Sequence, residues 1–207
     1  MANFKSLAAA LNNIDDATTL KLNLKKSEIP KEISFLKNLK TLYIQGLQIE
    51  SLNHSLSNLN NLETLYINAQ NIEVIPSSIL QLPKLNSLNL SQCNIKEFKI
   101  ELPLTTNIKT LFLNHNHLSE IPKNLEHLDS LEILNLNDNE LTLFPENLSK
   151  LIHLKRIYID RNLLEKLPIK TIKQFRKLNL ISLDGNKFSP EVKNEIQKEL
   201  NYWFGEI

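Results

Sequence analysis

The residues best suited to chemistry are two carboxylates and two histidines. Asp160 and Asp184 hold the same place in successive similar segments, and on adjacent strands their carboxylates would lie about 5 Å apart, a separation found in retaining glycosidases. Such catalysis needs an enclosed site that raises the pKa of one acid, whereas the open sheet that the segments predict provides none. His115 and His117 lie on a turn, and the spacing supplies no further metal ligands. We therefore predict that the protein is not an enzyme and uses no metal or cofactor.

Cys93 is the only cysteine of the chain, so an internal disulfide cannot form. Because disulfides mark proteins of oxidising compartments, we expect a cytoplasmic protein, or a secreted one if a leader has been removed. Cys93 stands at a place that asparagine holds in later segments. A buried thiol far from a base is unreactive, so we interpret Cys93 as a structural residue.

Aromatic and amide side chains recur at one place in successive segments, where they favour molecular recognition. We call this set the tyrosine column; it consists of Tyr43, Tyr66, Asn89, Phe112, Asn135, Tyr158 and Ser182. Tyr and Phe supply a large, rigid contact area with little loss of entropy. A second interpretation is that neighbouring rings, such as those of Tyr43 and Tyr66, stabilise the sheet by cross-strand packing. We predict a binding surface.

Charged residues gather near the C-terminal end of this surface. Arg156 and Arg161 are two of the three arginines of the chain, and they lie close to three aspartates. The aspartates are Asp138, Asp160 and Asp184. Such a patch favours an anchor for a carboxylate-bearing segment, and the alternative is an internal salt-bridge cluster of little energetic value. The candidate binding residues are Tyr43, Tyr66, Asn89, Phe112, Asn135, Tyr158, Arg156, Arg161, Asp160 and His115.

These places recur because the chain repeats itself every 23 residues. Each copy begins with L-x-x-L-x-L, continues with a polar turn and an apolar residue, and often ends in an apolar-Pro pair. The first residues of the copies are Leu39, Leu62, Leu85, Ile108, Leu131, Leu154 and, after 24 residues, Leu178. A shorter first copy contains Leu22, Leu24 and Pro30, which makes eight units with the last one truncated.

Two periods within each copy predict two kinds of structure. The spacing of two in L-x-L places both leucines on one face of a short strand, and the spacing of three after the proline fits a helical or 3-10 turn. Repetition at constant length stacks the strands into a parallel sheet with a spacing of about 4.8 Å. One copy cannot fold alone, because its apolar side chains contribute about 14 kcal/mol, which is less than the cost of ordering its backbone at about 1 to 2 kcal/mol per residue.

The pattern L-x-x-L-x-L-x-x-N/C-x-L over residues 19–188 resembles a leucine-rich repeat. The Ile-Pro or Leu-Pro pair after the turn is similar to the repeats of Ras-suppressor-like, Roco and bacterial leucine-rich repeat proteins. The resemblance implies an α/β fold that is a right-handed, curved solenoid, with the parallel sheet on the concave face and short helical or 3-10 segments on the convex face. We expect a single domain over residues 1–207. The scaffold binds many kinds of ligand, so the fold alone selects no function.

The ninth place of such repeats normally holds an asparagine whose amide bonds the backbone of the turns. In this chain the place is held by Leu47, Gln70, Cys93, Asn116, Asn139, Asn162 and Asn186. Because leucine cannot form these hydrogen bonds, we expect the ladder of ninth-place residues to begin near Gln70 or Cys93.

The ends of a solenoid need caps that cover its apolar interior. Residues 1–18 are predicted to form an N-terminal helical cap, with a helix over 3–13 whose core-facing residues are Phe4, Leu7, Ala8 and Leu11. Residues 189–207 are predicted to form a capping helix with Ser189 as N-cap and Pro190 in the first position. Its core-facing residues are Val192, Ile196, Leu200 and Trp203. The alternative for this amphipathic helix is partner binding.

Composition excludes several other classes. The chain has only three glycines, so no glycine-rich loop can cradle a phosphate. With 24 Lys and Arg against 23 Asp and Glu, we expect no nucleic-acid partner. No apolar run approaches the roughly 18 to 20 residues of a membrane span, so we expect no membrane insertion.

We therefore predict a monomeric protein-protein interaction module that binds a protein or peptide on its concave face. The resemblance to Ras-suppressor-like repeats makes a small GTPase one candidate partner, and a host or bacterial surface protein is another. The alternative is a carbohydrate-binding module, in which the tyrosines stack on sugar rings and the asparagines bond hydroxyls. A purely structural spacer is a third interpretation.

Overall fold

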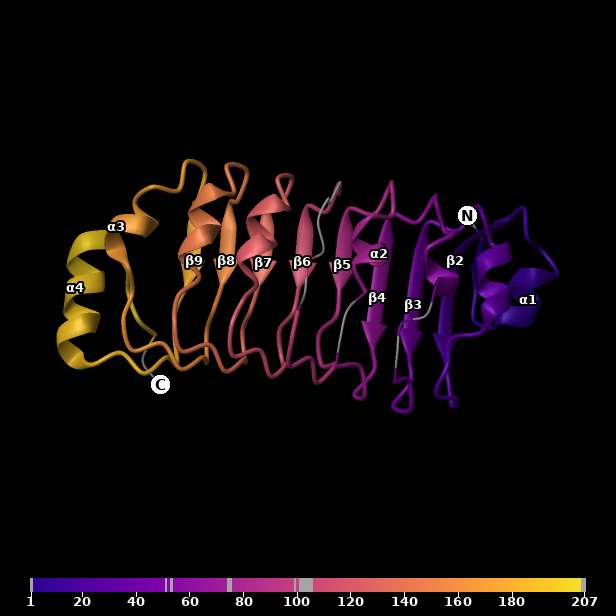
Figure 1. The fold of residues 1–207 in the computed structure, drawn as a ribbon, viewed down its shortest axis with the longest axis horizontal. Coiled ribbons are helices and arrows are strands. Elements are labelled where there is room, and N and C mark those ends of the chain that lie inside the picture. The colour runs from indigo at the N-terminus through magenta and orange to yellow at the C-terminus, as the bar shows by residue number, and fades with distance from the viewer. Residues whose placement is uncertain are drawn as a thin grey trace.

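The computed structural model describes residues 2–50, 52, 54–73, 76–98, 100 and 106–205. In this part of the chain, nine parallel strands form one sheet in sequence order. The strands are β1 (Ala2–Phe4), β2 (Ala17–Asn23), β3 (Thr41–Gln45), β4 (Thr64–Asn68), β5 (Ser87–Asn89), β6 (Thr110–Phe112), β7 (Ile133–Asn135), β8 (Arg156–Tyr158) and β9 (Leu180–Ser182). Each connection leads from one strand to the next strand directly beside it in the sheet, as in a solenoid (Figure 1).

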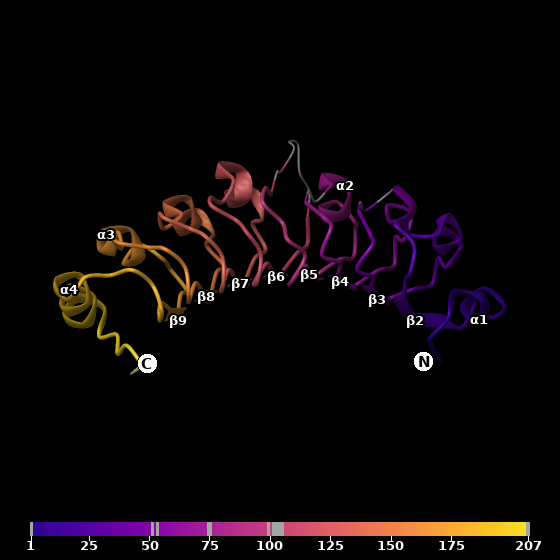
Figure 2. The ribbon, with the colours of Figure 1, turned by 90° about the horizontal axis from the view of Figure 1, so that it is seen from below.

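Short helical segments connect the strands on the outer side of the molecule. They are the 3-10 helices η1 (Lys31–Phe35), η2 (His54–Leu56), η3 (Lys123–His127) and η4 (Glu146–Lys150), and the α-helices α2 (Ser77–Leu80) and α3 (Ile169–Ile172). Figure 2 shows the strands on the inner side of an arc and these segments on its outer side. A helix is about 10 Å wide, whereas strands lie about 4.8 Å apart, so the sheet becomes the concave face, as predicted.

Proline begins most of these outer segments. The residues directly before η1, α2, η3, η4 and α3 are Pro30, Pro76, Pro122, Pro145 and Pro168. The ring fixes φ near −65° and the residue has no backbone N–H to satisfy. The carbonyl of Pro30 accepts the first hydrogen bond, from the backbone N–H of Ile33 at 3.2 Å. The prolines therefore start the helical or 3-10 turns that the spacing after them predicts.

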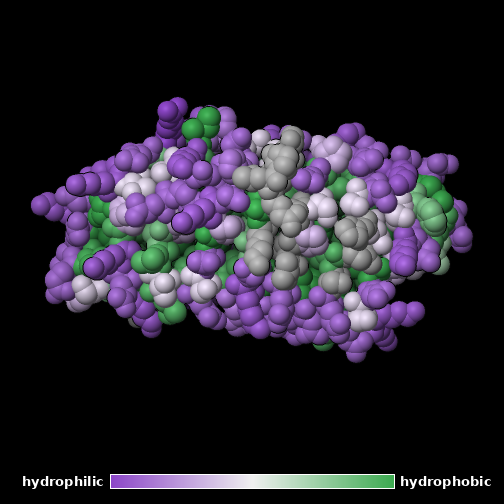
Figure 3. Space-filling view, viewed as in Figure 1, coloured by the Kyte–Doolittle hydropathy of each residue, from purple (hydrophilic) through white to green (hydrophobic). Residues whose placement is uncertain are grey.

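The core is a thin apolar layer between the sheet and the outer segments. Each strand from β2 to β8 contributes one fully buried side chain to a continuous row across the sheet. The row consists of Leu20, Leu42, Leu65, Leu88, Leu111, Leu134 and Ile157. The convex face is covered mainly by hydrophilic residues with apolar patches between them (Figure 3). The leucine excess of the sequence is therefore used for a long, shallow core.

Asparagine side chains satisfy the backbone of the turns in the C-terminal half. Asn116 Oδ1 accepts from the backbone N–H groups of Cys93 and Ile95, both at 3.0 Å, and its Nδ2 donates to the carbonyls of Leu90 and Leu113, both at 2.9 Å. Asn139, Asn162 and Asn186 repeat both donated bonds and accept from one backbone N–H each. Hydrogen bonding of these buried groups removes a penalty of about 1 to 3 kcal/mol for each unsatisfied one.

The ladder begins at Cys93 and not at Gln70. The thiol of Cys93 donates to the carbonyl of Ile67 at 3.3 Å, which is 26 residues earlier, as Leu90 is relative to Asn116. Gln70 is exposed, and Ala69 is buried in its place. The reason is that β3 and β4 continue two residues longer than β5, so the inward alternation carries on to Gly46 and Ala69. Only a small residue fits there, because a Cβ at Gly46 would lie 2.6 Å from the carbonyl oxygen of Leu24.

The N-terminal cap differs from the predicted helix over residues 3–13. Residues 2–4 form β1, which extends the sheet beyond β2, and the helix is confined to α1 (Leu7–Leu11). Ser6 begins α1, since its hydroxyl accepts from the backbone N–H of Ala9 at 3.2 Å. Ala10 is the buried residue of this helix, whereas Ala8 is exposed. A strand covers the sheet edge because it pairs with the exposed backbone of β2, which a helix cannot do.

The C-terminal cap is the predicted helix, α4 (Pro190–Leu200). The hydroxyl of Ser189 accepts from the backbone N–H of Val192 at 3.3 Å, which makes Ser189 the N-cap as predicted. Ile196 is fully buried against the last repeats. The burial of this face favours the capping role over the alternative of a free partner-binding helix.

The segment after α4 corrects the predicted face of the cap. The helix ends at Leu200 because Asn201 adopts a left-handed conformation with φ of 51°. Trp203, expected on the buried face, is 79% exposed. Tyr202 and Phe204 pack against the core in its place, and the hydroxyl of Tyr202 accepts from the backbone N–H of Leu183 at 2.8 Å.

Candidate functional site

The tyrosine column forms one row across the concave face. The strand register pairs Tyr43 with Tyr66, and the row continues through the remaining members to Ser182. All seven side chains are half-buried, because they stand on the open side of a sheet whose other side is the core. The sequence-based placement of this column is therefore correct, and the structure aligns its members on adjacent strands.

The rings of Tyr43 and Tyr66 contact each other. Their centroids are 5.8 Å apart with an interplanar angle of 41°, and Lys21 Nζ lies 4.8 Å from the Tyr43 ring centroid. This is the cross-strand packing of the second interpretation, and it also holds the rings in fixed positions. Phe112 and Tyr158 have asparagine or serine on both sides in the register. Their rings make no ring contact within the described residues.

Two asparagines of the column have a structural contact. The side-chain oxygen of Asn89 accepts from the backbone N–H of Ser91 at 3.0 Å, and Asn135 makes the same bond with Asn137 at 3.0 Å. These bonds lie just after the ends of β5 and β7, where the chain enters the turn. The amide nitrogens of both side chains make no hydrogen bond in the described part of the chain.

Arg161 belongs to an internal ion pair. Its Nε and Nη2 donate to the two carboxylate oxygens of Asp138 at 2.5 and 2.7 Å, a bidentate geometry that is among the stronger hydrogen-bonded pairs. The hydrogen bond from Arg161 holds the pKa of Asp138 below its usual value, and Asp138 raises the pKa of Arg161. His115 Nδ1 lies 3.5 Å from the same carboxylate. For Arg161 the geometry favours the salt-bridge interpretation over the binding anchor.

Asp160 is also occupied by its neighbours. Its Oδ1 accepts from the hydroxyl of Ser182 at 2.5 Å and from the backbone N–H of Asp184 at 2.8 Å. Its Oδ2 accepts from the amide of Asn137 at 3.2 Å. The carboxylate of Asp184 in turn accepts from the backbone N–H of Gly205 at 3.2 Å. The two carboxylates thus connect β8, β9 and the C-terminal segment.

Arg156 differs from Arg161. It is exposed at the start of β8, next to Ile133 and Leu180 in the register. It takes part in no salt bridge among the residues that the structure describes. Of the charged residues predicted for the site, Arg156 is the one whose charge is directed to solvent without a described partner.

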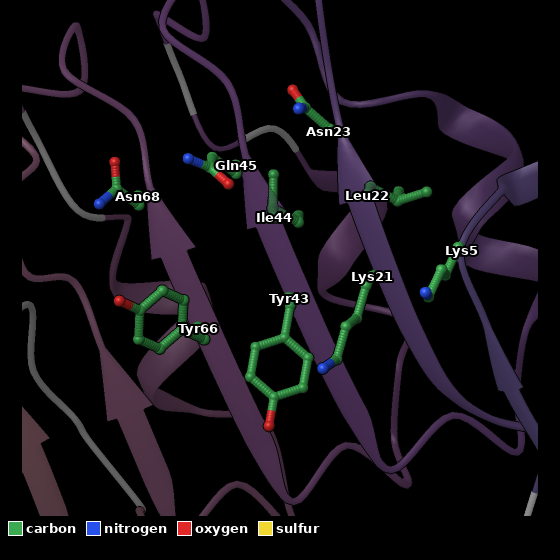
Figure 4. Close-up of a pocket in the computed structure, with 9 residues that line it drawn as sticks. All are labelled: Lys5, Lys21, Leu22, Asn23, Tyr43, Ile44, Gln45, Tyr66 and Asn68. Carbon is green, nitrogen blue, oxygen red and sulfur yellow. The ribbon is translucent and has the colours of Figure 1, made fainter.

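A hollow opens at the N-terminal end of the concave face, which sequence reasoning did not single out. It has a volume of about 420 Å³, and Figure 4 shows the side chains around it. The lining residues are Lys5, Lys21, Leu22, Asn23, Tyr43, Ile44, Gln45, Tyr66 and Asn68. Lys21 is in register with Tyr43, so extending the tyrosine column by one repeat towards the N-terminus would have found it. Lys5 had no such signal, because it lies between β1 and α1, outside the repeats.

The described residues contain neither a metal site nor a membrane-spanning helix. No group of three or more His, Cys, Asp and Glu side chains is placed to hold a metal ion there. Among the helices described, none has the length and apolar character needed to cross a membrane. Burial raises the pKa of the Cys93 thiol to about 11, so the thiol is protonated at neutral pH, in agreement with its structural interpretation.

Comparison with known proteins identifies the fold. Residues 107–128 and 130–151 match the family model Leucine Rich Repeat, and they cover most of two copies of the pattern. No curated protein matches the chain in sequence. In solved structures, 396 chains resemble it, so the likeness identifies a widely used scaffold and no single function.

Two solved structures illustrate the likeness. Internalin C2 of Listeria monocytogenes strain 4b F2365 superposes with a TM-score of 0.65 and 23% identity, over 81% of this chain and 70% of internalin C2. Toll in the Toll–Spatzle complex of Drosophila superposes with a TM-score of 0.74 and 22% identity, over 88% of this chain and 25% of that chain. Together with the single sheet of parallel strands, these matches show a leucine-rich repeat solenoid. The similarity to Ras-suppressor-like and Roco repeats stays a prediction.

Proposed function

We propose that this chain is a non-catalytic module that binds a protein partner along its concave face. The observation that carries the proposal is the tyrosine column, a row of seven half-buried side chains in register on the open face of the sheet. The likeness to Toll supports it, because that solved structure is a complex of Toll with Spatzle. The likeness to internalin C2 supports the fold alone.

The dimensions of the face fit a protein interface. From β3 to β9 the column crosses six strand intervals, which span about 29 Å at a spacing of about 4.8 Å. A standard interface buries about 800 Å² on each partner, equivalent to a disc about 32 Å across. Half-buried aromatic rings are suited to such a surface, because they are held in place before binding and lose little entropy. Phe112 and Tyr158, which have no ring neighbour, keep the most area for a partner.

The charged residues divide into two roles under this proposal. Arg156, exposed and outside any described salt bridge, orients the partner through an acidic group. Arg161 and Asp160 hold the sheet and the C-terminal segment together, since their charged atoms are already hydrogen-bonded. Substituting Arg156 is therefore expected to affect binding, whereas substituting Arg161 is expected to affect stability first.

Photo-crosslinking tests the proposed face. A benzophenone amino acid replaces Phe112, in the middle of the column, and in a matched control it replaces His127, which is exposed on η3 of the convex face. With an extract of the source organism, we expect a discrete protein adduct from position 112 and none from position 127. An adduct from position 127 alone would place binding on the convex face, and no adduct from either position would contradict the proposal.

Affinity measurements with the captured partner then test the residues. We expect Tyr158→Ala and Tyr66→Ala each to weaken binding by about tenfold, because truncating an aromatic contact residue removes a large part of the binding energy of an interface. Unchanged affinity for both variants would remove the tyrosine column from the site. The identity of the adduct distinguishes a small GTPase from a surface protein. Binding to a glycan array that is lost in Tyr66→Ala but retained in Arg156→Ala would instead assign carbohydrate binding.

A further inference from the structure

We infer that the N-terminal hollow of the concave face selects an acidic, extended peptide segment. The carboxylates of the segment lie against Lys5 and Lys21, and an apolar side chain of the segment lies on the rings of Tyr43 and Tyr66. The inference rests on the proposed function, because it names the chemistry of the partner segment that one end of the same face receives.

The charges of the hollow are the first support. Lys5 and Lys21 are both exposed, and no carboxylate lines the hollow beside them. Neither lysine takes part in a salt bridge in the described part of the chain. Three cations beside other strands are paired, since Lys40 pairs with Glu63, Lys155 with Glu132 and Arg161 with Asp138. Arg156 in β8, at the other end of the face, has no described partner either. Two uncompensated positive charges therefore remain at this end, where they attract carboxylates.

The position of Lys21 is the second support. Its ammonium lies 4.8 Å from the Tyr43 ring centroid, and the two tyrosine rings are 5.8 Å apart. The contact with the ring holds the ammonium over the sheet rather than leaving it to extend freely into solvent. Figure 4 shows Lys21, Tyr43 and Tyr66 side by side on successive strands. A cation followed by two rings is complementary to a segment with an acid followed by an apolar residue.

A row of amides gives the third support and indicates an extended backbone. Asn23, Gln45 and Asn68 are in register beside the row of Lys21, Tyr43 and Tyr66. Asn68 Nδ2 donates to the side-chain oxygen of Gln92 at 2.9 Å, and the side-chain oxygen of Asn68 accepts no hydrogen bond from the described residues. Amides both donate and accept hydrogen bonds, as a peptide backbone requires.

The lengths agree with this geometry. Crossing from β2 to β4 covers about 10 Å at a spacing of about 4.8 Å. In an extended peptide, residues i and i+2 lie on one side and are about 6.7 Å apart. Acids at i and i+2 therefore reach the two lysines, and an apolar residue at i+4 reaches the tyrosine pair. The volume of about 420 Å³ lies within the range of about 300 to 1,000 Å³ found for ligand pockets.

The test uses two capped synthetic peptides, so that the glutamates are their only charges. The probe is acetyl-Glu-Ser-Glu-Ser-Leu-Ser-amide, and the control replaces both glutamates by glutamine. Amide chemical shifts of the 15N-labelled full chain locate each peptide and give its affinity. We expect the probe to shift residues 21–23, 43–45 and 66–68 and to bind at least about fivefold more tightly than the control at low ionic strength. This preference should fall as salt is raised.

Matched substitutions test the lysines. We expect Lys21→Glu to weaken binding of the probe by about tenfold, because an attraction becomes a repulsion, and Lys5→Glu to act in the same direction. Lys123→Glu makes the same change of charge on η3 of the convex face and should leave affinity within about twofold. Lys21→Met keeps the stem over Tyr43 and removes only the charge, so it separates loss of charge from loss of folding. Thermal unfolding checks each variant.

Several results would overturn the inference. Equal affinity for the two peptides, shifts around residue 156 instead of the hollow, or indifference to both lysine substitutions would each do so. The two experiments also distinguish failure of this inference from failure of the proposed function. If position 112 captures a protein whose binding does not change in Lys21→Glu, the concave interface stands and the acidic preference is wrong. If the probe binds at the hollow while position 112 captures nothing, the hollow stands and the extended protein interface is wrong.

Discussion

Residue by residue, the ninth place of the repeats shows how one structural need is met by different side chains. Asn116 accepts two backbone N–H groups and donates to two carbonyls, whereas Cys93 donates one thiol hydrogen bond to the carbonyl of Ile67. One repeat before Cys93, the buried residue is Ala69, whose methyl group fills the space under the turn and forms no hydrogen bond. The turns of the N-terminal half therefore rely on the longer strands β3 and β4, and those of the C-terminal half on side-chain amides.

The buried thiol makes stability depend on pH in the alkaline range. Burial raises the pKa of Cys93 from 9.0 to about 11, so the folded state binds a proton that the unfolded state has lost. The contribution is complete below pH 9 and is lost as pH rises from 9 to 11, with a total of about 3 kcal/mol. Urea unfolding of the wild type should therefore weaken over this interval more than that of Cys93→Ala, which lacks the thiol. Equal slopes of stability against pH in the two proteins would contradict the buried, protonated thiol.

Among the elements, the two ends of the solenoid are closed in different ways. At the N-terminus β1 continues the sheet and α1 covers the core behind it, while at the C-terminus α4 covers the core and the segment after it bonds to Asp184. The N-terminal arrangement leaves Lys5 between β1 and α1, beside Lys21, and so contributes one wall of the hollow. The cap is thus part of the candidate binding surface as well as a cover.

The C-terminal cap gives a direct test of its corrected face. We expect Ile196→Ala to lower the free energy of unfolding by about 2 to 4 kcal/mol, because the side chain is fully buried and its removal leaves a cavity. Trp203→Ala is the matched control, since Trp203 is 79% exposed and its change should stay within about 0.5 kcal/mol. Urea titration followed by circular dichroism measures both. A larger loss for Trp203→Ala would restore the original prediction that Trp203 packs against the core.

The elements also show what the sequence can predict. Regular spacing of Leu42, Leu65 and Leu88 gave the strands, their register and the concave face, because period and register are set by local alternation and repeat length. The caps occur once each, so no repetition helped. Residues 3–13 have an amphipathic pattern that fits a helix, yet the open edge of β2 favours a strand at residues 2–4. Such a preference depends on tertiary contact and cannot be seen in the segment itself.

The candidate site could likewise be predicted where its residues recur in each repeat, and not where they depend on contacts between repeats or with a cap. The tyrosine column was found because its members share one place in each repeat. The pairing of Arg161 with Asp138 and the three hydrogen bonds of Asp160 depend on side-chain geometry between repeats, so the sequence left binding and structural interpretations open. The hollow was missed because it combines Lys21, at the end of the column in the shortened first copy, with Lys5 from the cap.

In the molecule as a whole, the repeats are stacked in a line, so we expect a mutation to destabilise mainly the repeats near it. Each strand pairs only with its neighbours, so destabilising one repeat should act on nearby repeats and decay along the chain. Leu20 in β2 and Leu111 in β6 belong to the same buried row and are both fully buried, so they form a matched pair, one near the end and one in the middle. Alanine at either place removes the same atoms, at about 2 to 5 kcal/mol.

Hydrogen exchange distinguishes local from global unfolding in this pair. We expect Leu20→Ala to reduce amide protection over β1–β4 while β7–β9 keep theirs, because the end repeats can open without the rest. Leu111→Ala should reduce protection on both sides of β6. A uniform loss in both variants would mean that the solenoid unfolds as one unit. Under local unfolding, Leu20→Ala should also abolish binding of the acidic peptide at the hollow while leaving the face around Tyr158 folded, which links the stability of the N-terminal repeats to the ligand they are inferred to select.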